Sequence, residues 1–120
     1  VTGEKSLNIT DKVNFKRNIF QIISSTPYVK LEDGFYTLTA VIKNTSGFDK
    51  LEMYAESNGK KRKQSFNKEN KDWKQVEIKQ VAVKNGKVEI GFFANGKANA
   101  FCYVDDVVLT KQNKTIISDL

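Results

Sequence analysis

Apolar and polar residues alternate along most of the chain, and this period of two limits the fold more than any other feature. The segment FYTLTAVIK at 35–43 places its larger apolar residues on one face of an expected strand and its threonines on the other. The alternation changes phase near residue 80, and the last strand is interrupted at Asp105 and Asp106. About eight strands are expected, at 7–9, 19–23, 35–43, 51–55, 76–78, 81–83, 88–92 and 101–109.

Turn-forming residues separate these segments at the spacing of an antiparallel all-β domain. Asn-Gly pairs at 58–59, 85–86 and 95–96 favour type I′ hairpins, which need positive φ at both central positions. Pro27, the one proline, falls between two expected strands. Because 120 residues are too few for two self-sufficient cores, the pattern predicts one all-β domain, a two-sheet antiparallel β-sandwich.

The composition excludes several classes of function. The chain has no histidine, which removes the commonest general base and zinc ligand. Its one cysteine, Cys102, cannot form an internal disulfide and is expected to be a buried free thiol. Asp105 and Asp106 are adjacent on a strand, so we expect them on opposite faces, unable to flank one glycosidic bond. No apolar run approaches the roughly 18 residues of a membrane helix, and we expect no membrane insertion.

The net charge of +6 is compatible with a nucleic acid ligand and also with other acidic ligands. The basic run KKRK at 60–63 is the best candidate for phosphate binding. Acidic residues lie close to it in sequence, among them Glu52 and Glu56, and no aromatic signature of RNA binding accompanies it. We therefore expect no nucleic acid partner, whereas attraction to an acidic polysaccharide is consistent with the same charges.

Four segments in a fixed order carry a resemblance to a known family. Between Gly34 and Leu109 the chain contains GFYTLTAxIK, WKQVxI, NGKVEIGF and YVDDVxL. This series resembles the carbohydrate-binding modules that have a β-jelly-roll, galactose-binding-like fold and accompany secreted bacterial polysaccharide hydrolases. The resemblance implies a non-catalytic module, secreted or at the cell surface, whose partners are a polysaccharide or oligosaccharide and neighbouring domains of a larger chain. It also implies that Trp73 is mainly a packing residue.

The same resemblance implies one structural calcium ion and sets the domain boundaries. In related modules the residue that matches Asp105 supplies an oxygen to calcium, and carbonyls near Gly3 and Glu4 supply others, as suits a hard cation. The family's N-terminal G-x-F-E-like segment is absent here. We therefore expect a module at 1–111 that lacks an N-terminal segment, followed by a tail or the start of a linker at 112–120.

Strand alternation predicts where a glycan would bind. If Leu51 and Val88 face the core, then Tyr54 and Phe93 face outward, and in jelly rolls of this type their two strands share a sheet. Flat aromatic surfaces flanked by polar groups suit sugar rings. The candidate carbohydrate-binding residues are Tyr54, Phe93, Glu52 and Gln21 on the sheet, with Phe48, Asn95 and Asn99 at its rim.

An alternative function stays open. Tyr54 and Phe93 can equally cover the sheet or contact a neighbouring domain, which would make the chain a structural spacer or protein-docking domain without glycan binding. Phe101 and Tyr103 are expected on the opposite sheet beside Phe35, where an aromatic cluster suits a contact with other protein.

Overall fold

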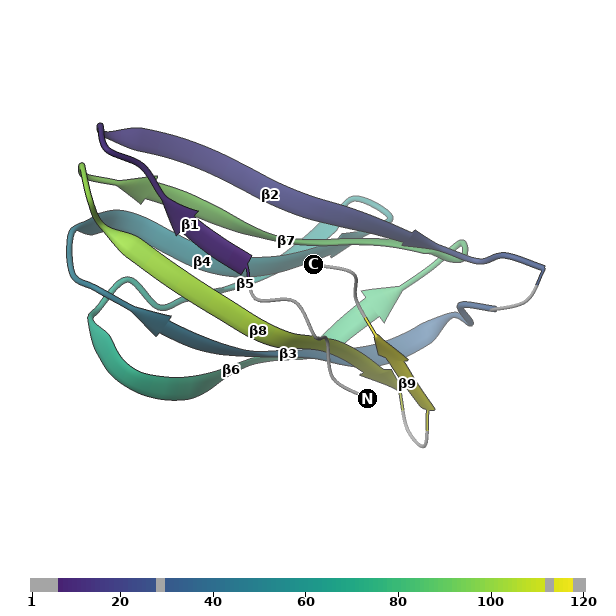
Figure 1. Cartoon of the computed structure of the whole chain (residues 1–120). Coiled ribbons are helices and arrows are strands. Elements are labelled where there is room, and N and C mark those ends of the chain that lie inside the picture. Colours follow the sequence, from purple (N-terminus) through teal and green to yellow (C-terminus); the bar gives the residue numbers. More distant parts are fainter. Residues whose placement is uncertain (1–6, 28–29, 112–113, 118–120) are drawn as a thin grey trace.

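The computed structural model describes residues 7–27, 30–111 and 114–117, and in this part of the chain it contains strands and no helix. Two antiparallel sheets lie face to face, as expected for a β-sandwich (Figure 1). No helix of the described part is long and apolar enough to cross a membrane. The strands are β1 (Leu7–Thr10), β2 (Phe15–Ser24), β3 (Gly34–Asn44), β4 (Phe48–Ser57), β5 (Lys60–Ser65), β6 (Asn70–Val83), β7 (Lys87–Gly96), β8 (Phe101–Lys111) and β9 (Lys114–Ile117).

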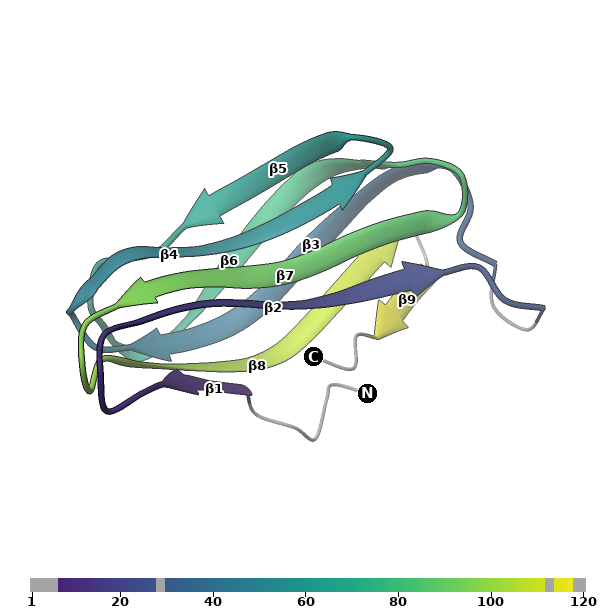
Figure 2. The same ribbon diagram turned by 90° about the horizontal axis from the view of Figure 1, so that it is seen from above.

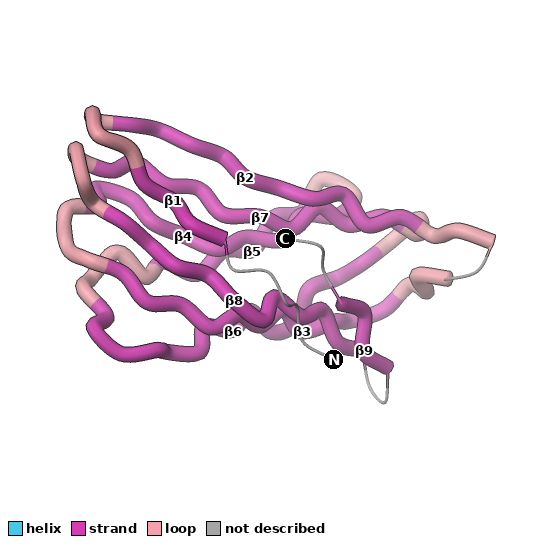
Figure 3. Tube along the Cα trace, in the orientation of Figure 1, coloured by secondary structure: helices cyan, strands magenta, loops and turns pink. Residues whose placement is uncertain are grey.

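Each sheet mixes strands that are distant in sequence. The five-stranded sheet has the order β1-β8-β3-β6, and β9 also pairs with β8. The four-stranded sheet has the order β2-β7-β4-β5 and lies toward the viewer in Figure 2. Most of the loops gather at the two ends of the sandwich, drawn in pink in Figure 3. The prediction of an all-β, two-sheet antiparallel sandwich is confirmed, and the lysine-rich segment 60–65 adds a strand, β5, to those expected.

The core lies between the sheets and consists of the alternate, inward-facing residues of the strands. Phe66 packs edge-on against Phe92, with ring centroids 6.4 Å apart. Burial of these side chains is the main favourable contribution to folding. The largest fully buried apolar side chains include Ile9, Tyr36, Leu38, Ile42, Leu51, Met53, Ile90, Phe92 and Leu109.

The two irregularities expected from the sequence are β-bulges. The change of phase near residue 80 occurs inside one continuous strand, β6, where Gln80 has a φ of 61°. The interruption of β8 lies at Asp106, whose φ is 52°. Because Val104 and Val107 on either side of this bulge are both buried, Asp105 and Asp106 both lie on the outer side of the strand. The expectation that they point to opposite faces is therefore wrong.

Two of the three Asn-Gly pairs form the predicted tight turns. Asn58-Gly59 and Asn85-Gly86 have positive φ at both positions, as type I′ hairpins require. The third prediction is wrong, since Asn95 and Gly96 end strand β7 and the chain turns after them. A Cβ atom at Gly96 would meet the Phe15 ring at 2.7 Å, so glycine is needed here for close packing.

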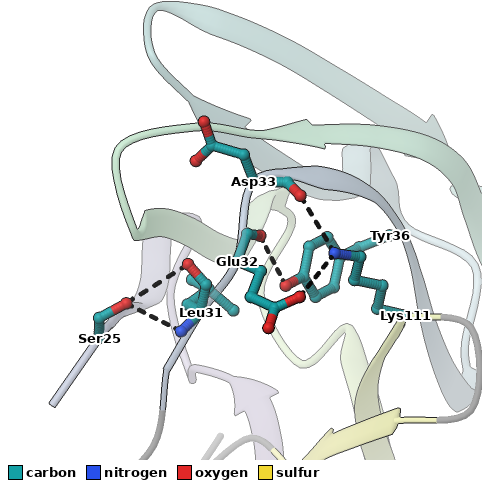
Figure 4. Close-up of polar contacts among 6 residues, drawn as sticks. All are labelled: Ser25, Leu31, Glu32, Asp33, Tyr36 and Lys111. Carbon is teal, nitrogen blue, oxygen red and sulfur yellow. Dashed lines mark hydrogen bonds and ion pairs between the residues drawn. The ribbon is translucent and has the colours of Figure 1, made fainter. Parts of the chain in front are cut away.

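The C-terminal end of β8 is fastened to the loop that enters β3. Lys111 Nζ donates a hydrogen bond to the carbonyl of Asp33 at 3.1 Å and pairs with the Glu32 carboxylate at 3.3 Å (Figure 4). The Tyr36 hydroxyl donates to the Glu32 carbonyl at 2.8 Å. These contacts link the end of β8 and the start of β3 to the loop that precedes β3.

The segment after β8 is part of the sheet. Lys114–Ile117 forms β9 and pairs antiparallel with residues 108–111 of β8. The prediction of a tail or linker at 112–120 is therefore wrong for these four residues.

The aromatic residues of the five-stranded sheet are arranged differently from expectation. Trp73, expected to be a packing residue, is 49% exposed, so that expectation is wrong. Phe101 and Tyr103 do form a pair, with ring centroids 5.1 Å apart. Phe35 is not beside them, because Phe35 pairs with Ala82 at one end of β3 whereas Tyr103 lies opposite a residue at the other end.

Candidate functional site

The outer face of the four-stranded sheet is the surface on which the sequence placed the glycan site. We use the term "outer face" for the side chains of this sheet that point away from the core. The register of the strands brings them into rows across the sheet, because residues directly opposite each other share a face. From β2 to β5 the rows are Lys16, Asn95 and Lys50; Asn18, Phe93, Glu52 and Ser65; Phe20, Gly91, Tyr54 and Lys63; and Ile22, Glu89, Glu56 and Lys61.

Tyr54 lies on the outer face, as predicted, but it is not an exposed platform. Its side chain is only 2% exposed. The hydroxyl comes within 2.8 Å of the position that a Gly91 Cβ would take, so the side chain extends across the neighbouring strand where no side chain blocks it. Lys61 Nζ lies 4.3 Å from the ring centroid, a cation–π contact that covers the ring. A sugar could therefore stack on Tyr54 only if Lys61 moved aside.

The Tyr54 hydroxyl is held by a carboxylate. It donates a hydrogen bond of 2.6 Å to Glu89 Oε2 on β7. Burial, with this hydrogen bond as the second cause, raises the pKa of Tyr54 to about 12. Tyr54 therefore stays protonated near neutral pH and fixes the orientation of Glu89.

Glu52 is also on the outer face and is buried, which is unusual for a carboxylate. Its Oε2 atom lies 3.9 Å from Nζ of Lys63 on the adjacent strand β5. The ion pair partly compensates the burial of the charge. Glu52 consequently pairs with Lys63 of β5 and offers little surface to a ligand.

Phe93 and Asn95 lie where the sequence placed them, facing outward from β7 and partly exposed. Lys50 Nζ is 5.7 Å from the centroid of the Phe93 ring. The exposed amide of Asn99 lies in the loop that follows β7, also as expected. Phe93 is thus an aromatic surface with polar neighbours.

Two predicted site residues point into the molecule. Gln21 pairs with the buried Ile90, so it faces the other sheet and not the outer face. Phe48 is buried in the core, edge-on to Phe15 with centroids 6.1 Å apart. An irregularity in the pairing of β4 with β7 follows Phe48 and turns this residue inward. Both placements correct the sequence-based prediction.

The outer face has an exposed aromatic residue that is not among those predicted from the sequence. Phe20 is 50% exposed and lies opposite Gly91, and Ile22 beside it is also exposed. The segment IFQII at 19–23 is nearly all apolar, so alternation alone did not indicate which side faces the core. Phe15 could have resolved this. It lies in the core, and alternation from Phe15 along the strand turns Ile19 and Ile23 inward and Phe20 outward.

A hollow of about 310 Å³ opens at the hairpin end of the outer face. Its lining includes Ile22, two glutamates (Glu56 and Glu89), two lysines (Lys84 and Lys87) and residues of the two Asn-Gly hairpins. The hairpins are joined by a hydrogen bond of 3.2 Å from Asn85 Nδ2 to Asn58 Oδ1. This arrangement of hydrogen-bond acceptors, amides and an apolar side chain matches the mixed surface of a sugar ring.

The described residues do not form a complete calcium site. Asp105 lies on the outer side of β8, and its Oδ1 atom already accepts a hydrogen bond of 2.8 Å from the backbone N–H of Asp106. Within the described ranges no group of three or more acidic, histidine or cysteine residues could hold a metal ion. Calcium takes six to eight oxygens, and the other expected ligand, Gly3, lies outside the described residues.

Cys102 is a buried free thiol, as predicted. Burial raises its pKa to about 12. The thiol therefore stays protonated and unreactive near neutral pH.

Comparisons with known proteins identify the fold, although no family model and no curated protein matches the chain. The structure of TmCBM61 in complex with β-1,4-galactotriose aligns with a TM-score of 0.74 and 22% identity, covering 91% of this chain and 72% of that one. A family 16 carbohydrate-binding module aligns with a TM-score of 0.60 and 18% identity, covering 91% of this chain and 78% of that one. A CBM4 structure aligns with a TM-score of 0.59 and 18% identity, covering 90% of this chain and 72% of that one.

The chain therefore has the β-sandwich fold of the carbohydrate-binding modules, as the sequence resemblance implied. At these identities the likeness shows the fold alone.

Proposed function

We propose that the chain is a carbohydrate-binding module that holds a polysaccharide against the outer face of its four-stranded sheet. The observation that carries the proposal is the combination of two outward aromatic rings, Phe20 and Phe93, with a polar hollow on the same face. The fold likeness supports it, since TmCBM61 is seen with a galactotriose.

The binding chemistry follows from the geometry of the face. Phe20 and Phe93 lie on adjacent strands and offset by one row, so that one extended chain can contact both rings. Apolar C–H faces of sugars pack against such rings, and the carboxylates of Glu56 and Glu89 accept hydrogen bonds from hydroxyl groups.

The benefit of such a module would lie in tethering. If the chain belongs to a secreted or cell-surface bacterial protein that degrades polysaccharides, bound glycan would be kept at a high effective concentration near the neighbouring catalytic domain. One structural calcium ion, bound by Asp105 and by carbonyls near Gly3, belongs to the same proposal.

Affinity electrophoresis tests the function directly. The purified chain is run through gels containing β-galactan, β-glucan, xylan, mannan or pectin, each with calcium and with a chelator. We expect retardation by at least one polysaccharide, and a loss of retardation or of thermal stability with chelator if calcium is part of the fold. Absence of retardation in every gel by a folded protein would contradict glycan binding and favour a spacer or docking domain.

The single tryptophan provides an internal control for this experiment. Trp73 is on β6, in the other sheet, and half exposed. A glycan bound to the outer face therefore leaves the emission of Trp73 unchanged, whereas a shifted emission would place the ligand on the five-stranded sheet.

A further inference from the structure

The outer face carries more positive than negative side chains. Among the residues of β2, β7, β4 and β5 that strand pairing places outward there are five lysines and three glutamates, a sum of 5 − 3 = +2, which the exposed Asp49 at the irregularity beside Lys50 lowers to +1. The lysines are spread over four rows and both ends of the face, so the excess is not confined to one corner. They are Lys16, Lys50, Lys61, Lys63 and Lys87.

Two of the glutamates already interact closely with neighbouring side chains, whereas the lysines are exposed. Glu52 is buried against Lys63, and Glu89 accepts the hydrogen bond from Tyr54. Lys50 and Lys61 are exposed, and each places its ammonium group over an aromatic ring, at 5.7 Å from the Phe93 centroid and 4.3 Å from the Tyr54 centroid. A ligand that approaches either ring therefore comes within reach of an ammonium group.

A neutral sugar that packs on the rings gains no charged hydrogen bond to offset its approach to the two ammonium groups, and on Tyr54 it would lose the cation–π contact with Lys61. An anionic sugar can pack on Phe20 and Phe93 and add charge-assisted hydrogen bonds to both ammonium groups. We infer that the ligand of the outer face is an acidic polysaccharide, one with carboxylate groups along the chain as in polymers of uronic acids. This inference rests on the proposed function and specifies its ligand class.

The mixed charge of the face favours a polyuronate over a nucleic acid. Glu56 and Glu89 lie directly opposite each other on adjacent strands, between Lys61 and Lys87. Their carboxylates can accept hydrogen bonds from the several hydroxyl groups of each uronic acid. The same carboxylates repel the closely spaced phosphates of a nucleic acid.

Binding to polygalacturonate and to neutral β-galactan tests the inference, measured by calorimetry at low and at high salt. We expect the intact chain to bind polygalacturonate more tightly than galactan and to lose affinity as salt rises. The double variant Lys50→Gln/Lys61→Gln is expected to bind polygalacturonate roughly 2- to 30-fold more weakly, the range for two exposed ion pairs. Lys61→Arg, which keeps the charge, should retain most of the affinity.

The matched control is Lys74→Gln/Lys79→Gln on β6, which removes the same charge from the other sheet. It should change the affinity by less than roughly 2-fold, because these lysines belong to the sheet opposite the proposed binding face.

Tighter binding of galactan, or an equal loss in both double variants, would overturn the inference and leave glycan binding intact. Tighter binding of single-stranded DNA or RNA would overturn it in favour of a nucleic acid ligand. Binding of no polymer, neutral or acidic, would contradict the proposed function as well.

Discussion

The double variant Phe20→Ala/Phe93→Ala is expected to lose polysaccharide binding altogether in affinity electrophoresis. The two rings are the outward aromatic surfaces of the outer face, and truncation of a central aromatic contact costs about 2 kcal/mol or more, a loss of roughly 30-fold for each ring. Since the affinity of a shallow site is modest, both losses together take binding below detection. Both rings are partly or half exposed, so the variant should fold normally.

Phe35→Ala is the matched control for this prediction. Phe35 is 64% exposed, and it belongs to β3 of the other sheet. Its removal should leave retardation unchanged. If Phe20→Ala/Phe93→Ala bound normally while Phe35→Ala did not, the glycan site would have to be moved to the five-stranded sheet.

Gly91→Ala is expected to destabilise the fold by about 1–3 kcal/mol, the usual cost of forcing extra atoms into a packed position. The added Cβ would lie 2.6 Å from the carbonyl oxygen of Ile19, 2.8 Å from the Tyr54 hydroxyl and 2.9 Å from the Phe20 Cβ. The first of these is a backbone atom of the adjacent strand, so β2 must move away from β7. Urea denaturation measures the effect as a lower midpoint with an unchanged slope.

A second variant separates the two sources of this strain. Tyr54→Ala combined with Gly91→Ala removes the contact with the hydroxyl but leaves the contact with the Ile19 carbonyl. We therefore expect that Gly91→Ala costs less in the Tyr54→Ala background than in the intact chain, but still destabilises it. An unchanged midpoint for Gly91→Ala alone would mean that the strands are not as close at this position as described.

The fold followed from features that are local in sequence. The alternation in β3, the change of phase in β6 and the interruption of β8 at Asp106 each depend on residues within one strand. Asn-Gly turns could be recognised for the same reason where they join two strands, as at Asn58-Gly59. Alternation and turn chemistry together were sufficient to predict a sandwich.

The site was predicted only in part, because it depends on contacts between strands. Tyr54 is buried because Gly91 on the adjacent strand leaves room for its side chain, and no pattern within β4 indicates this. Gln21 was assigned to the wrong face because the apolar segment around it fits either phase. Phe48 turns inward through an irregularity in strand pairing that the sequence does not mark. Phe93 and Asn95, in a clearly alternating strand, were placed correctly.

NMR chemical-shift mapping shows whether the outer face of the four-stranded sheet binds a glycan. A ¹⁵N-labelled chain is titrated with oligosaccharides of whichever polysaccharide retards it in the gels. We expect the perturbed amides to cluster in β2, β7 and β4, around Phe20, Phe93 and Glu56, and we expect that amides near Trp73 and Tyr103 do not shift. Perturbations confined to the five-stranded sheet, around Trp73 and Tyr103, would contradict it.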